Sequence, residues 1–534
     1  MRHLFLFASL FFLTACSQKK ETPATVQSVR LSMSEEPVSL DPRKSRDLTG
    51  VNLLHMLFEG LTRTSLNGDV ELALAREVTV SEDGLRYQFQ LRPSVWSDGT
   101  PLTSADFVFA WKEILDPQFP SDIAHQLFPI KNGRRAKLGE VTREAIGIYA
   151  PHPETLIVEL EQPLPYFLEL LAMPPFFPVP QKIALQNPNW ALEANSFVSN
   201  GPFAMQSWDH TYEVALKKNP RYWKSDEVHF DAVHLIVSPA DTALRMFEEG
   251  KVDWIGSPLG TIPIDAVQEL KRQAQLSASP FLATSFLRVN TSPEIHGKKN
   301  PLSSVWLRRA LALAVDRKTI AEHLLQGGQK EARALVPPEM GLQSEGYFQE
   351  EGASACLEKA REELGDCLAP LVLSYYNNER NAAMAQALQK QWETNLSLRV
   401  EIEAVEPKVY FQKVSHREFQ LATGSWTADF NDPVNFLEVF KYQDNGTNNT
   451  GWEDPQYIDL LNRSQLCRDS EERKQLLREA EALLMDQMPL IPIYHFALNY
   501  LKREELDGVF LSPLGQLDLR WAHWELDQPS LSKR

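Results

Sequence analysis

The sequence predicts an α/β fold, because strand-like and helix-like segments alternate along the chain. Apolar residues, many of them β-branched, gather in short runs at 156–160, 233–237 and 398–402, as is typical of strands. Apolar residues recur at helical spacing over 382–392 and 471–485. With 534 residues and 43% hydrophobic content, the chain can bury substantial cores, and its length favours about three or four domains.

A strand, a tight turn and a helix are predicted in succession over 87–111. Apolar and polar residues alternate over 87–91, as in a half-buried strand. The letters S-D-G at 97–99 supply the chemistry of a turn, and Thr103 or Ser104 can cap the helix that follows. Beyond this cap, apolar residues return at helical spacing. On local physics alone, such a unit is common to many proteins.

The same segment also carries letters that are typical of one family. The order F-x-L-R, W-S-D-G-x-P-L-T and A-D-F closely resembles the signature of the extracytoplasmic peptide-binding proteins that feed ABC importers. Further segments resemble landmarks of this family, in its order and at its spacing: L-D-P at 40–42, L-F-E-G-L at 57–61, N-G-P-F at 200–203, N-P and Y-W at 219–223, F to D at 247–253, R-A-L and D-R at 309–317, and S-W-T-A-D-F-N-D-P at 425–433. The resemblance covers nearly the whole mature chain.

This resemblance implies a two-lobed periplasmic-binding-protein fold with a hinge and an additional inserted domain. One lobe of such a fold is assembled from segments that lie far apart in the sequence. Carried over to this chain, the expected divisions are lobe I at 30–58, 183–284 and 498–534, the inserted domain at 59–182, and lobe II at 285–497.

The amino terminus predicts export and a lipid anchor. A basic start precedes an apolar run at 4–13, which is too short to span a bilayer and is typical of a secretory signal peptide. The run ends in L-T-A-C, the bacterial lipoprotein pattern. We therefore expect removal of 1–15 and lipid on Cys16, at the start of a polar tether over 16–29. The alternative is an ordinary signal peptide that contains Cys16 by chance.

Charge and location limit the partners. The net charge of -17 repels nucleic acid and anionic lipid surfaces, so neither is expected to bind. The anchor predicts a protein on the extracytoplasmic face of a bacterial membrane, in the periplasm. The resemblance implies a monomer that binds an oligopeptide and cooperates with the permease subunits of an ABC transporter.

A receptor for peptides of varied sequence must hold what all peptides share, which is the backbone and the two charged ends. The natural arrangement is β-augmentation, with one carboxylate to receive the terminal ammonium. In the family this carboxylate belongs to the W-x-x-D motif, which corresponds to Asp429, and Trp426 forms a wall nearby. The alternative for Asp429 is a turn or helix-cap residue before the N-D-P at 431–433.

The resemblance also implies two strands that flank the bound peptide. The main chain of Ser425 to Thr427 is expected to form one of them, in lobe II. The spacing between the landmarks on either side assigns Arg46, Asp47 and Leu48 to the other strand, in lobe I.

The sequence departs from the oligopeptide receptors where the ligand carboxylate is held. The expected basic residues fall on Val414 and Thr423, which are uncharged. His416, Arg417 and Arg380 can substitute, although each is also an ordinary surface charge. This departure leaves ligand length open. It also admits relatives that bind cell-wall muropeptides, nickel chelates or haem.

Motifs of the common enzyme classes are missing from the sequence. It has no H-E-x-x-H for a zinc hydrolase, no G-x-S-x-G for a serine hydrolase and no P-loop for an ATPase. We therefore predict a binding protein that is not an enzyme, with no cofactor and no metal site. A further class left open is a surface adhesin or a holding chaperone that uses the cleft for unfolded chains.

Overall fold

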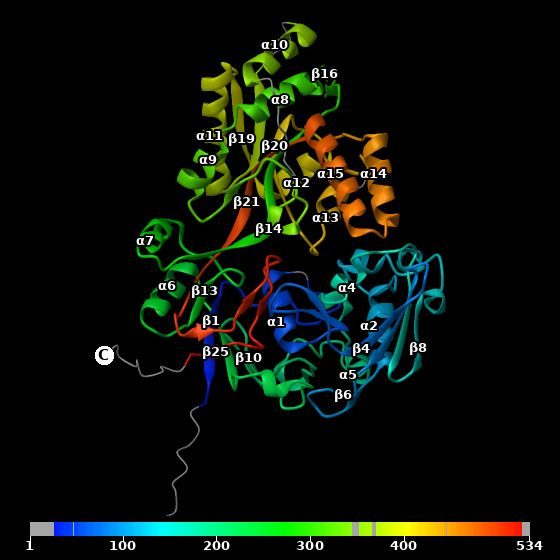
Figure 1. Cartoon of the computed structure of the whole chain (residues 1–534). Helices are drawn as coiled ribbons and strands as arrows, with labels where there is room; N and C mark the ends of the chain where they lie inside the picture. Colours follow the sequence, from blue (N-terminus) through cyan, green and yellow to red (C-terminus); the bar gives the residue numbers. More distant parts are fainter. Residues whose placement is uncertain (1–25, 46, 344–351, 366–369, 445, 526–534) are drawn as a thin grey trace, which may run out of the picture.

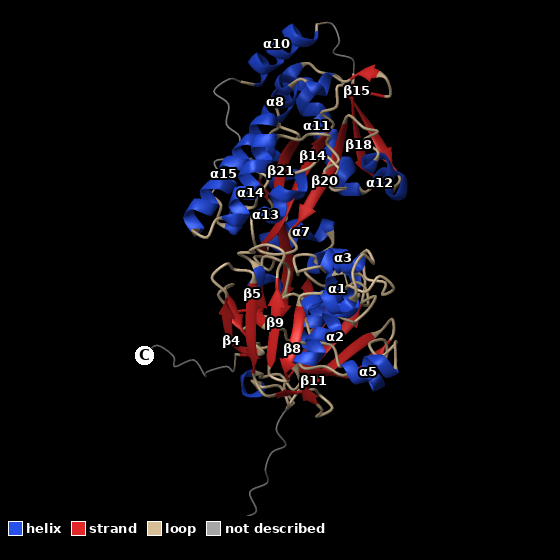
Figure 2. Ribbon diagram, turned by 90° about the vertical axis from the view of Figure 1, so that its right-hand side faces the viewer, coloured by secondary structure: helices blue, strands red, loops and turns tan. Residues whose placement is uncertain are grey.

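The computed structural model describes residues 26–45, 47–343, 352–365, 370–444 and 446–525. Its elements form an upper and a lower group in Figure 1, and two long strands run from one group to the other. The segments predicted to form lobe I and the inserted domain lie side by side in the lower group, and those predicted to form lobe II make up the upper group. In the view of Figure 2 helices dominate the upper group, whereas strands are prominent in the lower one.

The two connecting strands are β14 (Ser277–Val289) and β21 (Leu490–Lys502), which pair antiparallel along most of their length. The pairing shifts register between Pro280 and Thr284, midway between the lobes. Because both strands belong to one continuous sheet, the lobes share a backbone connection that can bend without breaking either core.

Eleven strands of the described chain make up this sheet. On the lobe I side of β21 the order outward is β13 (Trp254–Gly256), β1 (Ser28–Met33), β12 (Ala232–Val237), β11 (Glu213–Lys218) and β10 (Phe203–Asp209). On the lobe II side of β14 it is β20 (Leu421–Thr427), β18 (Leu371–Tyr376) and β19 (Val400–Val405), while the short β17 (Lys330–Glu331) pairs with β21.

The strand, turn and helix predicted over 87–111 are confirmed, and they lie in the inserted domain. Its antiparallel sheet has the order β4 (Ala75–Val80), β5 (Arg86–Leu91), β9 (Thr155–Glu159) and β8 (Ile148–His152). Phe89 and Leu91 face the core, as the alternation required. The helix is α2 (Ser104–Ile114), and Thr103 is its N-cap, with its backbone N–H donating to Asp106 Oδ2 at 2.8 Å.

Helices cover the sheet of lobe II. They include α8 (Val305–Leu313), α10 (Ala353–Leu364), α11 (Glu379–Leu396), α12 (Pro407–Ser415), α13 (Val434–Leu437), α14 (Pro455–Leu466) and α15 (Ser470–Gln487). In Figure 1, α13 to α15 lie directly above the inserted domain. The predicted strand at 398–402 begins two residues late, at Val400, because Ser397 ends α11 in the left-handed conformation at φ 53°.

The predicted domain boundaries near 284 and 497 fall inside β14 and β21, and they stay predictions. Residues 1–25, with the predicted signal peptide and Cys16, lie outside the described residues. Within the described part of the chain, none of the helices has the length and the apolar character needed to cross a bilayer.

Candidate ligand-binding site between the lobes

The lobe II strand that carries the predicted contact residues has an open edge. On one side β20 pairs with β14 from Leu421 to Thr427. On the other side, the described part of β18 pairs only with Leu421 and Ala422. Residues 424–427, which include Ser425, Trp426 and Thr427, therefore present one edge without a partner strand among the described residues, and Ser425 and Thr427 are exposed there. Such an edge can receive an extended peptide as an added strand.

Asp429 lies two residues beyond this edge and is held by an asparagine. Asn435 Oδ1 accepts hydrogen bonds from Asp429 N at 3.2 Å and from Trp426 Nε1 at 2.9 Å. Asn435 Nδ2 donates to Asp429 Oδ2 at 3.4 Å. The Asp429 carboxylate forms no ion pair within the described part of the chain. Asn435, the residue that fixes the predicted carboxylate and the predicted wall together, was missed by the sequence reasoning.

The environment of Asp429 makes its negative charge costly in the unliganded protein. The residue is exposed at the surface of the gap, yet enough protein surrounds the carboxylate that burial raises its pKa. The hydrogen bond from Asn435 and the charge of His125, in the inserted domain, oppose that shift. A ligand ammonium at this position would relieve the cost.

The turn role that sequence reasoning kept open for Asp429 belongs to Asp432. Asp432 Oδ1 accepts a hydrogen bond from Val434 N at 2.9 Å, at the start of α13. Both oxygens also bind the guanidinium of Arg473, at 2.8 and 2.9 Å, in a buried pair. These contacts fix the segment that carries Asp429 and leave the Asp429 carboxylate outside the cap.

The strand predicted at Arg46, Asp47 and Leu48 is not formed at Asp47 and Leu48, and the ligand contact predicted for these residues stays a prediction. Arg46 lies outside the described residues. Asp47 is extended but serves as the N-cap of α1 (Leu48–Leu57), with Oδ1 accepting from Gly50 N at 2.7 Å. Leu48 is already helical and is 39% exposed. An Asp directly before an apolar helical stretch is a strong capping signal, which outweighed the strand inferred from landmark spacing.

A cavity of about 590 Å³ opens beside the free edge of β20. Ser425 and Gly424 line it, together with the predicted Arg380 from the first turn of α11. Lobe I contributes Ile264, which is 63% exposed, and Phe411 on α12 is exposed to the same extent. Its other lining residues include Ser285, Arg288, Tyr376, Glu379, Tyr410 and Tyr494.

The other two predicted basic residues are placed elsewhere. His416 is the C-cap of α12, and Arg417 follows it with a positive φ of 58°. The Arg417 guanidinium donates to the carbonyl oxygen of Gln443. Neither residue lines the cavity at the β20 edge. His416 and Arg417 are close to Val414 in sequence but do not reach Ser425, because they lie beyond the C-terminal end of α12.

A second cavity, of about 430 Å³, lies where the inserted domain, lobe I and lobe II meet. Its lining includes Asp69 and Glu169 from the inserted domain and Glu339 and Phe430 from lobe II. The ring of Phe430 stacks on Tyr166 of the inserted domain, with centroids 4.4 Å apart. The cavity is therefore acidic and adjoins the segment that carries Asp429.

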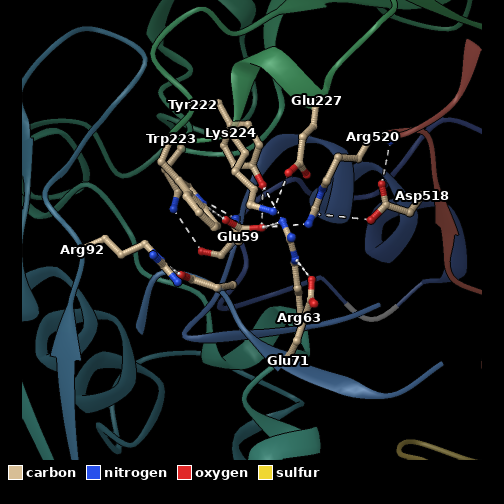
Figure 3. A network of polar contacts seen from close by, with 12 residues as sticks. Glu59, Arg63, Glu71, Arg92, Tyr222, Trp223, Lys224, Glu227, Asp518 and Arg520 are labelled. Atoms are coloured by element: carbon tan, nitrogen blue, oxygen red, sulfur yellow. Dashed lines mark hydrogen bonds and ion pairs between the residues drawn. The ribbon is translucent and has the colours of Figure 1, made fainter. Parts of the chain in front are cut away.

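Side chains of two family landmarks, at 57–61 and 219–223, meet in a buried network rather than at the site. Glu59 receives hydrogen bonds from Tyr222 Oη, at 2.8 Å, and from Trp223 Nε1 (Figure 3). Arg63 and Arg520 form ion pairs with Glu59, at 3.3 and 2.9 Å. These side chains come from the start of the inserted domain, from lobe I and from the last segment of the chain. The network joins the inserted domain to lobe I.

Comparison with known proteins identifies the family. Residues 69–448 match the model of the bacterial extracellular solute-binding proteins, family 5 Middle. This chain belongs to family 5 of the bacterial extracellular solute-binding proteins. The oligopeptide-binding protein OppA of Bacillus subtilis (strain 168) is 36% identical over 511 residues, which cover 93% of this chain and 93% of OppA. The family inferred from the sequence motifs is confirmed.

Solved structures of peptide-binding proteins confirm the two-lobed fold class. The periplasmic murein tripeptide-binding protein MppA, in its unliganded open form, superposes with a TM-score of 0.80 at 26% identity, covering 94% of this chain and 98% of MppA. OppA of Listeria monocytogenes bound to peptide gives a TM-score of 0.72 at 25% identity, covering 93% of this chain and 99% of that one.

Proposed function

We propose that this family 5 protein is an extracytoplasmic receptor that captures oligopeptides between its lobes and delivers them to an ABC permease. The observation that carries the proposal is the open edge of β20 at 424–427. Just beyond this edge lies the carboxylate of Asp429, which forms no ion pair with any described residue. An extended peptide requires both features, because its backbone needs partners and its ammonium needs a counter-charge.

Capture proceeds by closure. The peptide adds to β20 on lobe II and contacts lobe I and the inserted domain, so its binding energy favours the state in which the lobes approach. The hinge lies at the predicted lobe boundaries in β14 and β21. The permease then reads the closed state and accepts the peptide. The similarity to an open, unliganded MppA supports the assignment of this structure to the receiving state.

Cell-wall muropeptides are the second candidate ligand. The similarity to MppA, a murein tripeptide-binding protein, favours this class over the remaining alternatives. The relatives reported above are named for oligopeptides and murein peptides, which favours peptides over nickel chelates and haem. Nothing in the site favours an adhesin or a holding chaperone over a receptor for short peptides.

The proposed location is the outer face of a bacterial membrane, with lipid on Cys16 and the folded body as a monomer beyond the tether. The name of the family as extracellular binding proteins supports this location. The lipid itself follows from the L-T-A-C motif alone. Binding and release, with no bond made or broken in the ligand, account for every feature of the site.

The test has two parts. Mass spectrometry of a denatured sample identifies ligands that the purified protein retains, and extended peptides are the expected result. Calorimetric titration then compares a tetrapeptide with its backbone N-methylated analogue. Methylation should weaken binding far more than scrambling of the side chains does, because it removes strand pairing. Haem or a metal chelate as the retained ligand, or indifference to methylation, would contradict the proposal.

A further inference from the structure

An arginine that the sequence reasoning overlooked lies at the β20 edge. Arg288, near the end of β14, lines the 590 Å³ cavity together with Ser425. Its Nη1 donates to the carbonyl oxygen of Thr423 at 3.0 Å, and its guanidinium carbon lies 5.3 Å from the ring centre of Phe286. Burial lowers the pKa of Arg288, although the nearby Tyr410 counteracts that shift.

Arg288 has no anionic partner in the described part of the chain. Its contacts are with a carbonyl, a phenol and an aromatic ring, and it forms no ion pair with any described carboxylate. A cation enclosed in this way is costly unless an anion joins it. The cavity is open to the gap between the lobes, so that anion can come from a ligand.

One further cation and one anion line the cavity. Arg380 lines it from α11 and interacts with the hydroxyl of Tyr494, whose pKa burial raises. Glu379, the neighbouring residue on α11, is exposed and is the acidic residue of the lining. The lining therefore contains two guanidinium groups and one carboxylate, a surplus of one positive charge. The excess positive charge lies beside Gly424 and Ser425, where a ligand backbone would run.

The chain makes room for this guanidinium with a glycine. A Cβ atom on Gly424 would lie 2.1 Å from Arg288 Nη1 and 2.8 Å from its Cζ. Any other residue at this position would push the guanidinium aside. The pairing of Phe286 with Gly424 in the register of β14 and β20 fixes this close approach.

We propose that Arg288, assisted by Arg380, receives a carboxylate of the bound peptide. This inference rests on the proposed function and names the chemistry that the site selects, a ligand with an ammonium at one end and a carboxylate at the other. The ammonium lies at Asp429 and the carboxylate at Arg288, so the peptide runs along β20 in one direction only. Thr423, at the position where the family carries a basic residue, contributes its carbonyl oxygen to orient the arginine instead.

The spacing of the two charged residues also sets a preferred ligand length. Five residue steps separate Gly424, beside Arg288, from Asp429. An extended chain rises ~3.3 Å per residue, so the two sites lie at most roughly 17 Å apart. After allowance for an ion-pair distance at each end, a peptide of about three to five residues spans that gap.

The test is a double-mutant cycle between the arginine and the ligand carboxylate. Tetra-alanine and its carboxyl-terminal amide are titrated into the wild type and into Arg288→Met. The wild type should prefer the free acid by at least ~30-fold, as expected for a buried charge pair. Arg288→Met should lose most of that preference, because only the assisting Arg380 remains. An undiminished preference in Arg288→Met overturns the assignment.

Further arms separate the possible explanations. An amidated peptide with glutamate as its last residue tells whether the arginine accepts a side-chain carboxylate as well as the terminal one. Gly424→Ala displaces the guanidinium without removing its charge, and it should reduce the acid preference even if Arg288→Met does not fold. Lys390→Met is the matched control on α11, because Lys390 is exposed and pairs only with Glu393 among the described residues; it should keep the full preference.

The outcomes distinguish this inference from the proposed function. Tight binding of both tetra-alanine and its amide by the wild type leaves the peptide receptor intact and overturns the carboxylate site. Binding of neither peptide by a folded wild type overturns both. An acid preference that depends on Arg380 but not on Arg288 moves the site to α11 and overturns the role given to Arg288.

Discussion

Asn435 and Asp429 are joined by two hydrogen bonds that run in opposite directions. The amide oxygen of Asn435 accepts from Asp429 N at 3.2 Å, and its amide nitrogen donates to Asp429 Oδ2 at 3.4 Å. The same oxygen accepts from Trp426 Nε1. One side chain at the start of α13 thus sets both the position of the carboxylate and the orientation of the wall beside it.

Replacing Asn435 by Ala should weaken peptide binding without removing the charge at Asp429. Loss of the amide leaves Asp429 N and Trp426 Nε1 without their partner, at a cost of about 1 to 1.5 kcal/mol, which corresponds to roughly tenfold in affinity. Calorimetric titration with tetra-alanine measures the effect. Asn395→Ala, which removes an amide bonded to Ala314 far from the site, should leave affinity unchanged. Equal affinities for both variants would exclude a positioning role for Asn435.

Replacing Asp429 by Asn should reduce peptide affinity by about a hundredfold or more, since loss of one member of a buried ion pair costs on the order of 3 to 5 kcal/mol. An amino-terminally acetylated peptide should bind the wild type poorly and lose much less on mutation. The four affinities form a double-mutant cycle. A coupling energy near zero in a folded variant would show that the ammonium is held elsewhere.

Replacing Asp429 by Asn should leave the unliganded protein at least as stable as the wild type at neutral pH. The folded pKa of Asp429 is raised by burial above its unfolded value. The folded state therefore binds the proton more tightly, and its stability falls as pH rises past the unfolded pKa. Asp429→Asn removes that cost. Thermal unfolding at several pH values measures it, and a variant that unfolds well below the wild type would contradict the prediction.

As the pH is lowered, peptide binding should weaken at a higher pH than it would if Asp429 had the pKa of an ordinary aspartate. The ligand ammonium needs Asp429 ionised, and its raised pKa brings protonation to a higher pH. Binding near that pKa should release protons, because the ammonium lowers the pKa again. Titrations in buffers of different ionisation enthalpy detect the release. The acetylated peptide should show no such release, and proton uptake on binding of the free peptide would be inconsistent with this site.

Replacing Arg520 by Met should destabilise the fold while leaving the ligand contacts in place. Arg520 is fully buried between Glu59 and Asp518, at 2.9 and 3.4 Å (Figure 3). Its removal leaves buried carboxylates with too little positive charge, which typically costs about 3 to 5 kcal/mol. Calorimetry of thermal unfolding checks this, with Lys390→Met as the surface control. An unchanged melting temperature would contradict the role assigned to the network.

Replacing Cys16 by Ala should abolish acylation and leave ligand binding intact. The predicted lipid attaches through the thiol, whereas the described body begins ten residues later, at Val26. Metabolic labelling with a fatty acid checks the first part, and titration of the released protein checks the second. Label that persists in the variant would show that the lipoprotein motif is not used.

The sequence by itself determined the local elements and the family. The strand and helix around 87–111 could be predicted because alternation, turn residues and a capping Thr103 act over a few neighbouring residues. Asp429 and the segment 425–427 could be named because the motif that carries them is contiguous. Landmark spacing did not predict the N-cap at Asp47, because a cap depends on the local sequence before the helix.

Only the tertiary structure decided which charges share the site. Arg288, Arg380 and Gly424 lie on three different elements of lobe II, and the pairing of β14 with β20 brings the first to the third. His416 and Arg417 are closer to Ser425 in sequence, yet they lie beyond the end of α12 and away from the cavity. Separation in sequence does not reveal which residues are neighbours in space. Strand register and helix direction determine these neighbours, and both are long-range properties of the packed sheet.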